Sequence, residues 1–423
     1  MERVTMEWRV YDMPPQYTSQ LLQYRIGADA CMWRRFNEYN DSFVLSMTYS
    51  IEPYLHEMML QSEHRTFDPE EADFFYVPMY LTCLMWPVLG WADHPWYYAP
   101  LVKFRYFGMD APTMAPDEGA CYMPTVVYNN SIILTHWGRT DVNHTSGSAY
   151  DQDNYNMKMP DTFAGWPGMD WVPKVRGHPC YDPKKDLVIP AFKPPDHFRD
   201  SPLMAAPPLE RDLLLYFRGD VGQARFEHYS RGIRQKLFLM AYKHDWATKY
   251  KIYIGTGDTL PGSYSEHMAR SKFCLVAPGD GWSARAEDAV LHGCVPVVIM
   301  DGVAPVFDSL LDWSAFSLRV REDALHSLPA VLEAVGPERL ARMQRKLVRV
   351  WHRFAYASGP FMRQQYDNVL GHNARAFPPA VQKVSLGLTS RDTPFKPVTE
   401  FPFGDDAFGT IMQWLYHRIN ETR

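Results

Sequence analysis

The stretch that decides the fold is residues 271–302, SKFCLVAPGDGWSARAEDAVLHGCVPVVIMDG. It contains an apolar run at 273–277, a Pro-Gly-Asp-Gly turn, a short helical segment and a second apolar run at 295–300. Short, continuous apolar runs separated by a helix predict parallel strands that are buried on both faces. Because open parallel sheets bind ligands at the carboxyl ends of their strands, the turn at 278–282 is expected to lie at a ligand site.

Two residues bound the predicted helix between these runs. Ser283 is a suitable N-cap and Gly293 suits the position after the last turn, so the helix is expected to span residues 284–292. A helix N-terminus offers free N–H groups, and Arg285 adds positive charge in the first turn. This end of the helix is therefore expected to bind a diphosphate.

Helical periodicity divides the polar side chains of this segment into two groups. At about 100° per residue, Arg285, Asp288 and His292 fall on one side and are predicted to line a cleft, where a carboxylate could hold ribose hydroxyls. Glu287 points away from Arg285 and is expected to be solvated. The alternative is an ordinary Arg–Asp pair on the surface of an amphipathic helix, which is a frequent arrangement.

Length and composition bound the class of protein. The chain has 423 residues, enough for two domains, and its 46% hydrophobic and 22% charged residues are typical of a globular protein. A formal net charge of -6 argues against a nucleic-acid-binding protein, because contacts to phosphates need a clustered basic surface. Aromatic residues make up 14% of the chain, which suits stacking against sugars but also a large aromatic core.

The cysteines and the glycosylation sequons indicate in which cellular compartment the protein is expected to work. Six cysteines without a C-x-x-C pair predict no zinc site, and their even number permits disulfides. Four N-x-S/T sequons, at Asn40, Asn129, Asn143 and Asn420, favour the secretory lumen. No signal peptide is predicted at the charged start. The apolar run at 74–91 carries two prolines, so it is interpreted as a buried strand and its loop and not as a membrane span.

The chain is predicted to form two blocks and a tail. The first covers residues 1–195, and a proline-rich stretch near 193–209 is interpreted as a linker. Residues 205–375 alternate strand and helix, which predicts a doubly wound α/β domain. Its predicted strands are residues 213–217, 251–255, 273–277, 295–300 and 316–320. Residues 376–423 are expected to form an extended segment and a terminal amphipathic helix.

Several motifs along the chain carry a family likeness. They are RVYDMPP, DPEEADFFYVPMY, DEGAC, KKDLVIPAF, the FRGD turn, RGIRQKL, the stretch quoted at the start and the closing DAFGTIM. In this order they resemble the exostosin-type glycosyltransferases of family GT47, in the form found in plants and green algae.

The resemblance implies a GT-B fold, in which two Rossmann-like domains face a central cleft and a C-terminal helix returns to the first domain. Residues 1–195 would lie on the acceptor side, 205–375 would bind a nucleotide-sugar donor, and 376–423 would carry the returning helix. The implied reaction is an inverting transfer from a UDP-sugar to a glycan or glycoprotein, with no metal in the site. The implied enzyme is a Golgi-luminal type II membrane protein, whose anchor is absent from this chain, and it would form homo- or hetero-oligomers with another glycosyltransferase.

The resemblance also assigns roles to residues. In the family an arginine and an acid three residues later bind donor phosphate and ribose, and RAEDA places Arg285 and Asp288 in these positions. A second family arginine falls on Arg234, whose guanidinium would clamp the diphosphate. The complete predicted donor-binding set is Arg218, Gly219, Arg234, Gly279, Ser283, Arg285 and Asp288.

Inversion requires a base that takes the proton from the acceptor hydroxyl, and this base is expected to come from the first domain. Asp117 and Glu118 of DEGAC are the leading candidates, followed by His136 of LTHWG and His178 of RGHPC.

The chain departs from the family pattern just before these acids. The family places a Gly-Gly-Arg-Asp-His stretch there, whereas this chain has YFGMDAPTMAPDEGAC, in which Asp110 has no adjacent histidine. The departure motivates an alternative function, a non-catalytic subunit that keeps the fold and stabilises an active partner glycosyltransferase. The string Asp151-Gln152-Asp153 matches a metal-binding D-x-D but lies in a polar loop, so it is interpreted as a turn.

Overall fold

The structure is a computed structural model that describes residues 6–15, 18–23, 32–36, 42–44, 50–78, 80, 131–140, 142, 179–223, 225, 229–279, 282–376 and 405–419. Several positions singled out in the sequence lie outside the described residues: Asn40, Asp110, Asp117, Glu118, Asn129, Asn143, the string at 151–153, His178 and Asn420.

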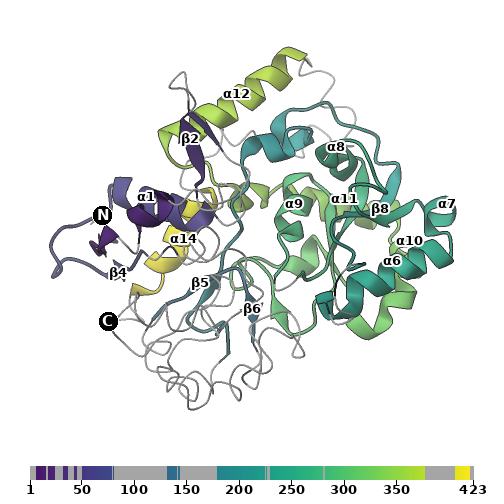
Figure 1. Ribbon diagram of the computed structural model, residues 1–423, viewed down its shortest axis with the longest axis horizontal. Helices are drawn as coiled ribbons and strands as arrows, with labels where there is room; N and C mark the ends of the chain where they lie inside the picture. The colour runs from purple at the N-terminus through teal and green to yellow at the C-terminus, as the bar shows by residue number, and fades with distance from the viewer. Residues whose placement is uncertain are drawn as a thin grey trace.

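A five-stranded parallel sheet forms the centre of the second block (Figure 1). Its strands are β8 (Leu213–Arg218), β9 (Ile252–Gly255), β10 (Ser271–Val276), β11 (Val295–Val298) and β13 (Leu318–Arg319), close to the predicted ranges. The spatial order is β13-β11-β10-β8-β9, and every neighbouring pair is parallel. The chain therefore reverses its direction of winding between β8 and β10, and in doubly wound sheets such a switch point marks the ligand crevice.

The strands form because their apolar runs are buried on both faces. Leu215, Phe273 and Val297 belong to one apolar cluster, whereas Tyr216 and Cys274 belong to another. Alternate residues of a strand point to opposite faces, so the two clusters lie on opposite sides of the sheet. The first cluster includes residues of α6 (Ile233–Lys243), α7 (Trp246–Tyr250), α10 (Leu328–Glu333) and α11 (Pro337–Leu347). The second includes residues of α8 (Tyr264–Ala269) and α9 (Arg285–Leu291).

The helix α9 begins and ends one residue inside the predicted range of 284–292, and Gly293 lies after its last turn as predicted. Gly293 follows it with a φ of +65°, a conformation that favours glycine. A Cβ at this position would also lie 2.9 Å from a guanidinium nitrogen of Arg211. The N-cap position is occupied by Ala284 and not by Ser283. The prediction of Ser283 as the N-cap was wrong, because α9 begins one residue later and the Ser283 hydroxyl accepts no hydrogen bond from the described helix amides.

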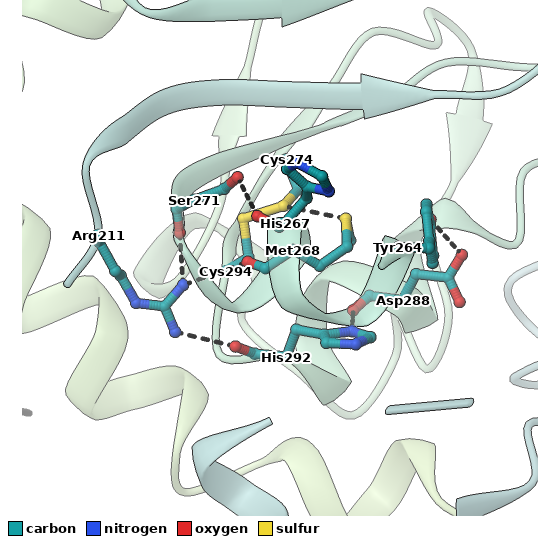
Figure 2. The surroundings of a disulfide bond; sticks show 9 residues. All are labelled: Arg211, Tyr264, His267, Met268, Ser271, Cys274, Asp288, His292 and Cys294. Carbon is teal, nitrogen blue, oxygen red and sulfur yellow. Dashed lines mark hydrogen bonds between the residues drawn. A yellow bond between two sulfur atoms is a disulfide. The ribbon is translucent and has the colours of Figure 1, made fainter. Parts of the chain in front are cut away.

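A disulfide bond joins the two strands that flank α9. Cys274 of β10 pairs with Cys294, which directly precedes β11, and both are buried (Figure 2). Beside it, the Arg211 side chain donates to the backbone carbonyls of Ser271 and His292, which ties the start of β10 to the end of α9. The helix is therefore fixed by covalent and hydrogen bonds at its C-terminal end.

The described part of the first block contains short strand pairs and one longer helix. The pairs are β1 (Trp8–Val10) with β4 (Phe74–Tyr76), β5 (Leu134–Thr135) with β7 (Leu187–Val188), both parallel, and β2 (Arg34–Phe36) with β3 (Ser42–Val44), which is antiparallel. The helix is α1 (Ile51–Gln61). The structure confirms a strand at the start of 74–91, but this strand is not fully buried. Phe75 is 46% exposed, and within the described ranges β4 pairs with β1 alone.

An antiparallel pair connects the two blocks, formed by β6 (Gly138–Arg139) and β12 (Val303–Ala304). The mixed α/β class is thus confirmed, while two facing Rossmann-like domains stay a prediction.

The last helices within the described residues are α12 (Pro360–Ala376) and α14 (Ala407–Tyr416), and α14 lies near α1 and β4 in Figure 1. Ile411 and Trp414 of α14 share an apolar core with Trp8 of the first block. Arg418, just after α14, donates to the backbone carbonyl of Lys184.

The short 3-10 helices within the described residues are η2 (Ser19–Gln23), η8 (Pro195–Phe198), η9 (Pro202–Met204), η10 (Tyr229–Gly232), η11 (Trp313–Ala315), η12 (Glu322–Ser327) and η13 (Trp351–Phe354). Within the described ranges, no helix combines the length and the apolarity needed to cross a membrane.

The predicted linker at 193–209 is packed into the protein and is not an exposed connection. Phe198, Leu203 and Met204 are almost completely buried in the same core as α1. The side chain of Asn373 in α12 donates to the backbone carbonyl of Met204. The prolines suggested a linker, but the apolar residues between them anchor the segment.

Candidate donor site

Two predicted arginines meet at the carboxyl ends of β8 and β10. Arg218 ends β8, and Arg285 begins the helix that follows β10. Nη2 of Arg285 donates to the backbone carbonyl of Arg218 at 3.1 Å. The ring of Tyr264 lies against both guanidinium groups, with its centroid 5.2 Å from that of Arg218 and 5.5 Å from that of Arg285. The Tyr264 ring thus makes cation–π contacts with two guanidinium groups at the switch point.

The third predicted arginine, Arg234 of α6, reaches the same edge of the sheet. Its Nη2 donates to the backbone carbonyl of Ala277, directly after β10, at 2.9 Å. Its Nη1 donates to the Tyr229 hydroxyl at 2.9 Å and to the backbone carbonyl of Asp220 at 3.2 Å. The side chain lies over the ring of Phe217 and Arg234 is buried, so it is not a solvated helix charge.

The two predicted glycines lie beside these guanidinium groups. A Cβ on Gly219 would lie 2.9 Å from Nη2 of Arg285, closer than real contacts of this kind. A Cβ on Gly279 would lie 3.5 Å from Nη2 of Arg234, at ordinary contact distance. Because Gly219 has no side chain, the guanidinium group of Arg285 has room at this position.

Asp288 is completely buried and accepts from four groups. Its Oδ1 lies 2.7 Å from Nζ of Lys193 and 3.0 Å from Nε2 of His197. Its Oδ2 accepts from the Tyr264 hydroxyl at 2.8 Å and from Nη1 of Arg285 at 3.1 Å. Because Asp288 is fully buried, the alternative of an ordinary Arg–Asp pair on the surface of an amphipathic helix was wrong.

Sequence reasoning missed Lys193, His197 and Tyr264. The first two lie in the stretch interpreted as a linker, more than 90 residues before Asp288. The available signal was the presence of two basic residues four positions apart in a proline-rich segment.

His292 was predicted to line the cleft, and this prediction was wrong. The residue is completely buried, and its Nδ1 lies 2.6 Å from the backbone carbonyl of Asp288 (Figure 2). Its Nε2 lies 2.9 Å from the Ser265 hydroxyl. Because a carbonyl only accepts, Nδ1 carries the proton and Nε2 accepts from Ser265. Burial lowers the pKa of the ring to about 3, so His292 is a neutral structural residue between α9 and α8.

Glu287 was expected to be solvated, and this prediction was also wrong. It is 1% exposed, and its Oε1 accepts from the backbone amide of Ala191 at 2.9 Å. The first block covers this side of α9, and burial raises the pKa of the Glu287 carboxyl to about 7.

The turn before α9 holds further polar groups at the site. The hydroxyl of Ser283 and Nε of Arg285 are buried without a hydrogen-bond partner among the described residues. Unmatched buried polar groups are costly unless a ligand or water satisfies them. Nε of Arg285 belongs to the guanidinium cluster, and Ser283 precedes Arg285 by two residues, so an anionic ligand at this turn could accept from both groups.

One candidate base lies beside this turn. The ring of His136 stacks on Trp282, with centroids 4.7 Å apart, and its Nδ1 lies 2.9 Å from the backbone carbonyl of Ile189. Nδ1 therefore carries the proton and Nε2 is left as an acceptor. Burial lowers the pKa of His136 to about 4, which keeps the ring neutral. The other three base candidates lie outside the described residues.

The described side chains contain no group of three or more His, Cys, Asp or Glu residues arranged to hold a metal ion. The expectation of a metal-free site stays a prediction.

Comparison with known proteins places this chain in a family. The model of the exostosin GT47 domain matches residues 9–101 and 115–335. The unmatched residues 102–114 contain Asp110, in the stretch that departs from the family pattern.

The chain is also similar to curated plant proteins. It is 28% identical over 356 residues to a probable glucuronosyltransferase of Oryza sativa subsp. japonica, covering 80% of this chain and 72% of the relative. It is 26% identical over 355 residues to a probable beta-1,4-xylosyltransferase of Arabidopsis thaliana, covering 80% and 74%. A probable glucuronoxylan glucuronosyltransferase of Arabidopsis thaliana is 27% identical over 349 residues, covering 81% and 66%. The chain therefore belongs to the exostosin GT47 family of glycosyltransferases.

Proposed function

We propose that this glycosyltransferase moves a sugar from a UDP-sugar to a glycan or glycoprotein acceptor, with inversion at the anomeric carbon. The observation that carries the proposal is the cluster of Arg218, Arg234 and Arg285 at the switch point of a parallel sheet. A nucleoside diphosphate carries its negative charge on a compact group that planar guanidinium forks bind well.

The arginines would also serve the chemistry. Departure of UDP builds negative charge on the β-phosphate, and fixed positive groups stabilise that charge. The Ser283 hydroxyl and Nε of Arg285, which lack partners among the described residues, would donate to the same diphosphate. We propose that arginine side chains supply the positive charge that a divalent cation supplies in other sites, so that the reaction needs no metal.

The base that activates the acceptor hydroxyl would come from the first block. Asp117 and Glu118 stay the candidates that the family resemblance favours. His136 is a further candidate, because its Nε2 is an acceptor next to the turn at the donor site.

The names of the relatives suggest the class of product. The curated relatives are named as probable glucuronosyl- and xylosyltransferases. We propose a plant-type cell-wall glycan as the acceptor and the Golgi lumen as the compartment. The buried disulfide and the four sequons support an oxidising, glycosylating environment.

Calorimetric titration with UDP tests the donor class. Arg285→Ala should weaken UDP binding by about tenfold or more, since charge-assisted hydrogen bonds are lost. Arg321→Ala is the matched control, because the Arg321 side chain is 75% exposed, pairs with Asp323 and follows β13, which β11 separates from β10 in the sheet. A wild-type protein that binds no UDP would show that the proposed donor class is wrong.

Hydrolysis of a panel of UDP-sugars then separates the two functions. Turnover of at least one UDP-sugar supports the enzyme and identifies its sugar. A protein that binds UDP, hydrolyses none of the panel and raises the activity of a partner glycosyltransferase would be the non-catalytic subunit.

A further inference from the structure

Asp288 accepts from as many donors as a carboxylate can hold. Two carboxylate oxygens offer about four acceptor positions. Lys193 and His197 bind Oδ1, and Tyr264 and Arg285 bind Oδ2. The family resemblance assigns the ribose of the donor to Asp288. A ribose hydroxyl that binds this carboxylate therefore takes the place of one of the four donors.

Three of the four donors are costly to replace. The Lys193 side chain is 5% exposed, so loss of its ion pair would leave an uncompensated charge in the interior. The Arg285 guanidinium is also held by the backbone carbonyl of Arg218. The Tyr264 ring lies against the guanidinium groups of Arg218 and Arg285, so it cannot move away from Asp288 without loss of these contacts.

His197 is the donor that can leave at the lowest cost. Burial alone would raise the pKa of the Asp288 carboxyl, but Lys193 and the other basic groups around it hold the pKa well below its usual range. An ionised carboxylate only accepts, so Nε2 of His197 carries the proton. An imidazole protonated on Nε2 alone is neutral, and its departure leaves Asp288 compensated by Lys193 and Arg285. The His197 side chain is 23% exposed, so the ring can turn toward solvent.

We propose that a ribose hydroxyl of the nucleotide replaces His197 on Oδ1 of Asp288, so that this histidine competes with the donor for the carboxylate. The inference rests on the proposed donor site. The hydroxyl and the imidazole each offer one neutral donor, and Lys193 stays on the same oxygen and keeps its segment against α9. His197 competes equally with the ribose of the UDP product, so it favours release of UDP after transfer.

Calorimetric titration of His197→Ala with UDP tests the inference. The variant should bind UDP about threefold to tenfold more tightly than the wild type, because no side chain has to be displaced. A general loss of structure would weaken binding and cannot imitate this gain. Equal or weaker binding by His197→Ala would overturn the inference, since it would mean that the histidine supports the site.

Two further variants at this position separate competition from side-chain size. His197→Gln keeps an N–H donor and should stay near the wild-type affinity. His197→Leu removes the donor but fills the space, so it should show the same gain as His197→Ala and keeps the test possible if that variant does not fold. A matched control is His244→Ala, since His244 is exposed and follows α6 at the opposite end from Arg234. Its UDP affinity should equal that of the wild type.

Nucleotide analogues identify the group that takes the position of the histidine. Titrations with 2′-deoxy-UDP and 3′-deoxy-UDP should show the gain of His197→Ala for one analogue and not for the other, which lacks the hydroxyl that binds Asp288. An equal gain for UDP and both analogues would overturn the inference, because the ribose hydroxyls would then have no part in the exchange.

The outcomes separate this inference from the proposed function. A wild type that binds no UDP overturns both. A wild type that binds UDP, with no gain of affinity in His197→Ala or His197→Leu, overturns the exchange alone.

Discussion

Substituting Glu287 by Gln tests the most unexpected feature of α9, a buried carboxyl that faces the first block. Burial raises its pKa from the ordinary value of 4.5 to about 7. Gln has the same shape and keeps an oxygen that accepts from the amide of Ala191, the hydrogen bond seen at 2.9 Å. The substitution therefore removes the titration and leaves the packing in place.

The size and sign of the effect follow from proton linkage. Between pH 4.5 and 7 the unfolded chain has lost the Glu287 proton, while the folded protein keeps it. The free energy of unfolding of the wild type should therefore fall as pH rises through this window, and stay lower above it. At 1.36 kcal/mol per pKa unit, the loss is about 3 kcal/mol.

Urea unfolding at several pH values between 5 and 8 measures this effect as a difference between two proteins. Other titrating groups contribute equally to the wild type and to Glu287→Gln, so they cancel. The variant should gain stability relative to the wild type as pH rises. Glu338→Gln, on the exposed side of α11, shows how much a surface substitution of the same kind contributes. A difference between Glu287→Gln and wild type that stays constant with pH would refute the reasoning.

Two further substitutions test contacts around the site. Gly219→Ala should weaken UDP binding by about threefold to tenfold, because its Cβ would lie 2.9 Å from Nη2 of Arg285 and push that side chain aside. Gly257→Ala, where a Cβ meets nothing within 4 Å, should leave binding unchanged, and equal losses in both variants would contradict the explanation. Replacing Cys274 and Cys294 together by Ser should lower the free energy of unfolding by about 3 kcal/mol, since the disulfide closes a loop with a sequence separation of 20. Urea unfolding measures this loss, and one below about 1 kcal/mol would mean that the bond constrains the unfolded chain little.

Local patterns predicted the second block well. The five strands of the parallel sheet are short apolar runs bounded by polar turns, and burial on both faces is a property that each run shows by itself. The C-terminal boundary of α9 followed from Gly293, because a positive φ is a local requirement. The clustering of the arginines followed from the rule that loops after parallel strands meet at one edge.

Long-range contacts were not predictable from these patterns. A helical wheel separates Glu287 from Arg285 correctly, but it assumes that one side of a helix faces solvent. On α9 one side meets the sheet and another meets the first block, so Glu287 is buried. The disulfide between Cys274 and Cys294 could not be derived either, since six cysteines permit 15 pairings.

The contacts of α9 suggest why this helix, which is proposed to bind the donor, is covered so completely by the first block. Asp288 binds the segment that contains Lys193, and Glu287 binds the backbone at Ala191, so two adjacent acids hold one stretch of chain. Arg285 is held by the same Asp288. The orientation of Arg285 and the position of the 191–197 segment therefore depend on one carboxylate. Because coupling between sites is reciprocal, a ligand that fixes Arg285 would also favour the observed position of that segment. Burying two carboxyls in the interior is unfavourable in isolation, but it links the end of the helix that is proposed to bind phosphate to the block from which the acceptor-side base is expected to come.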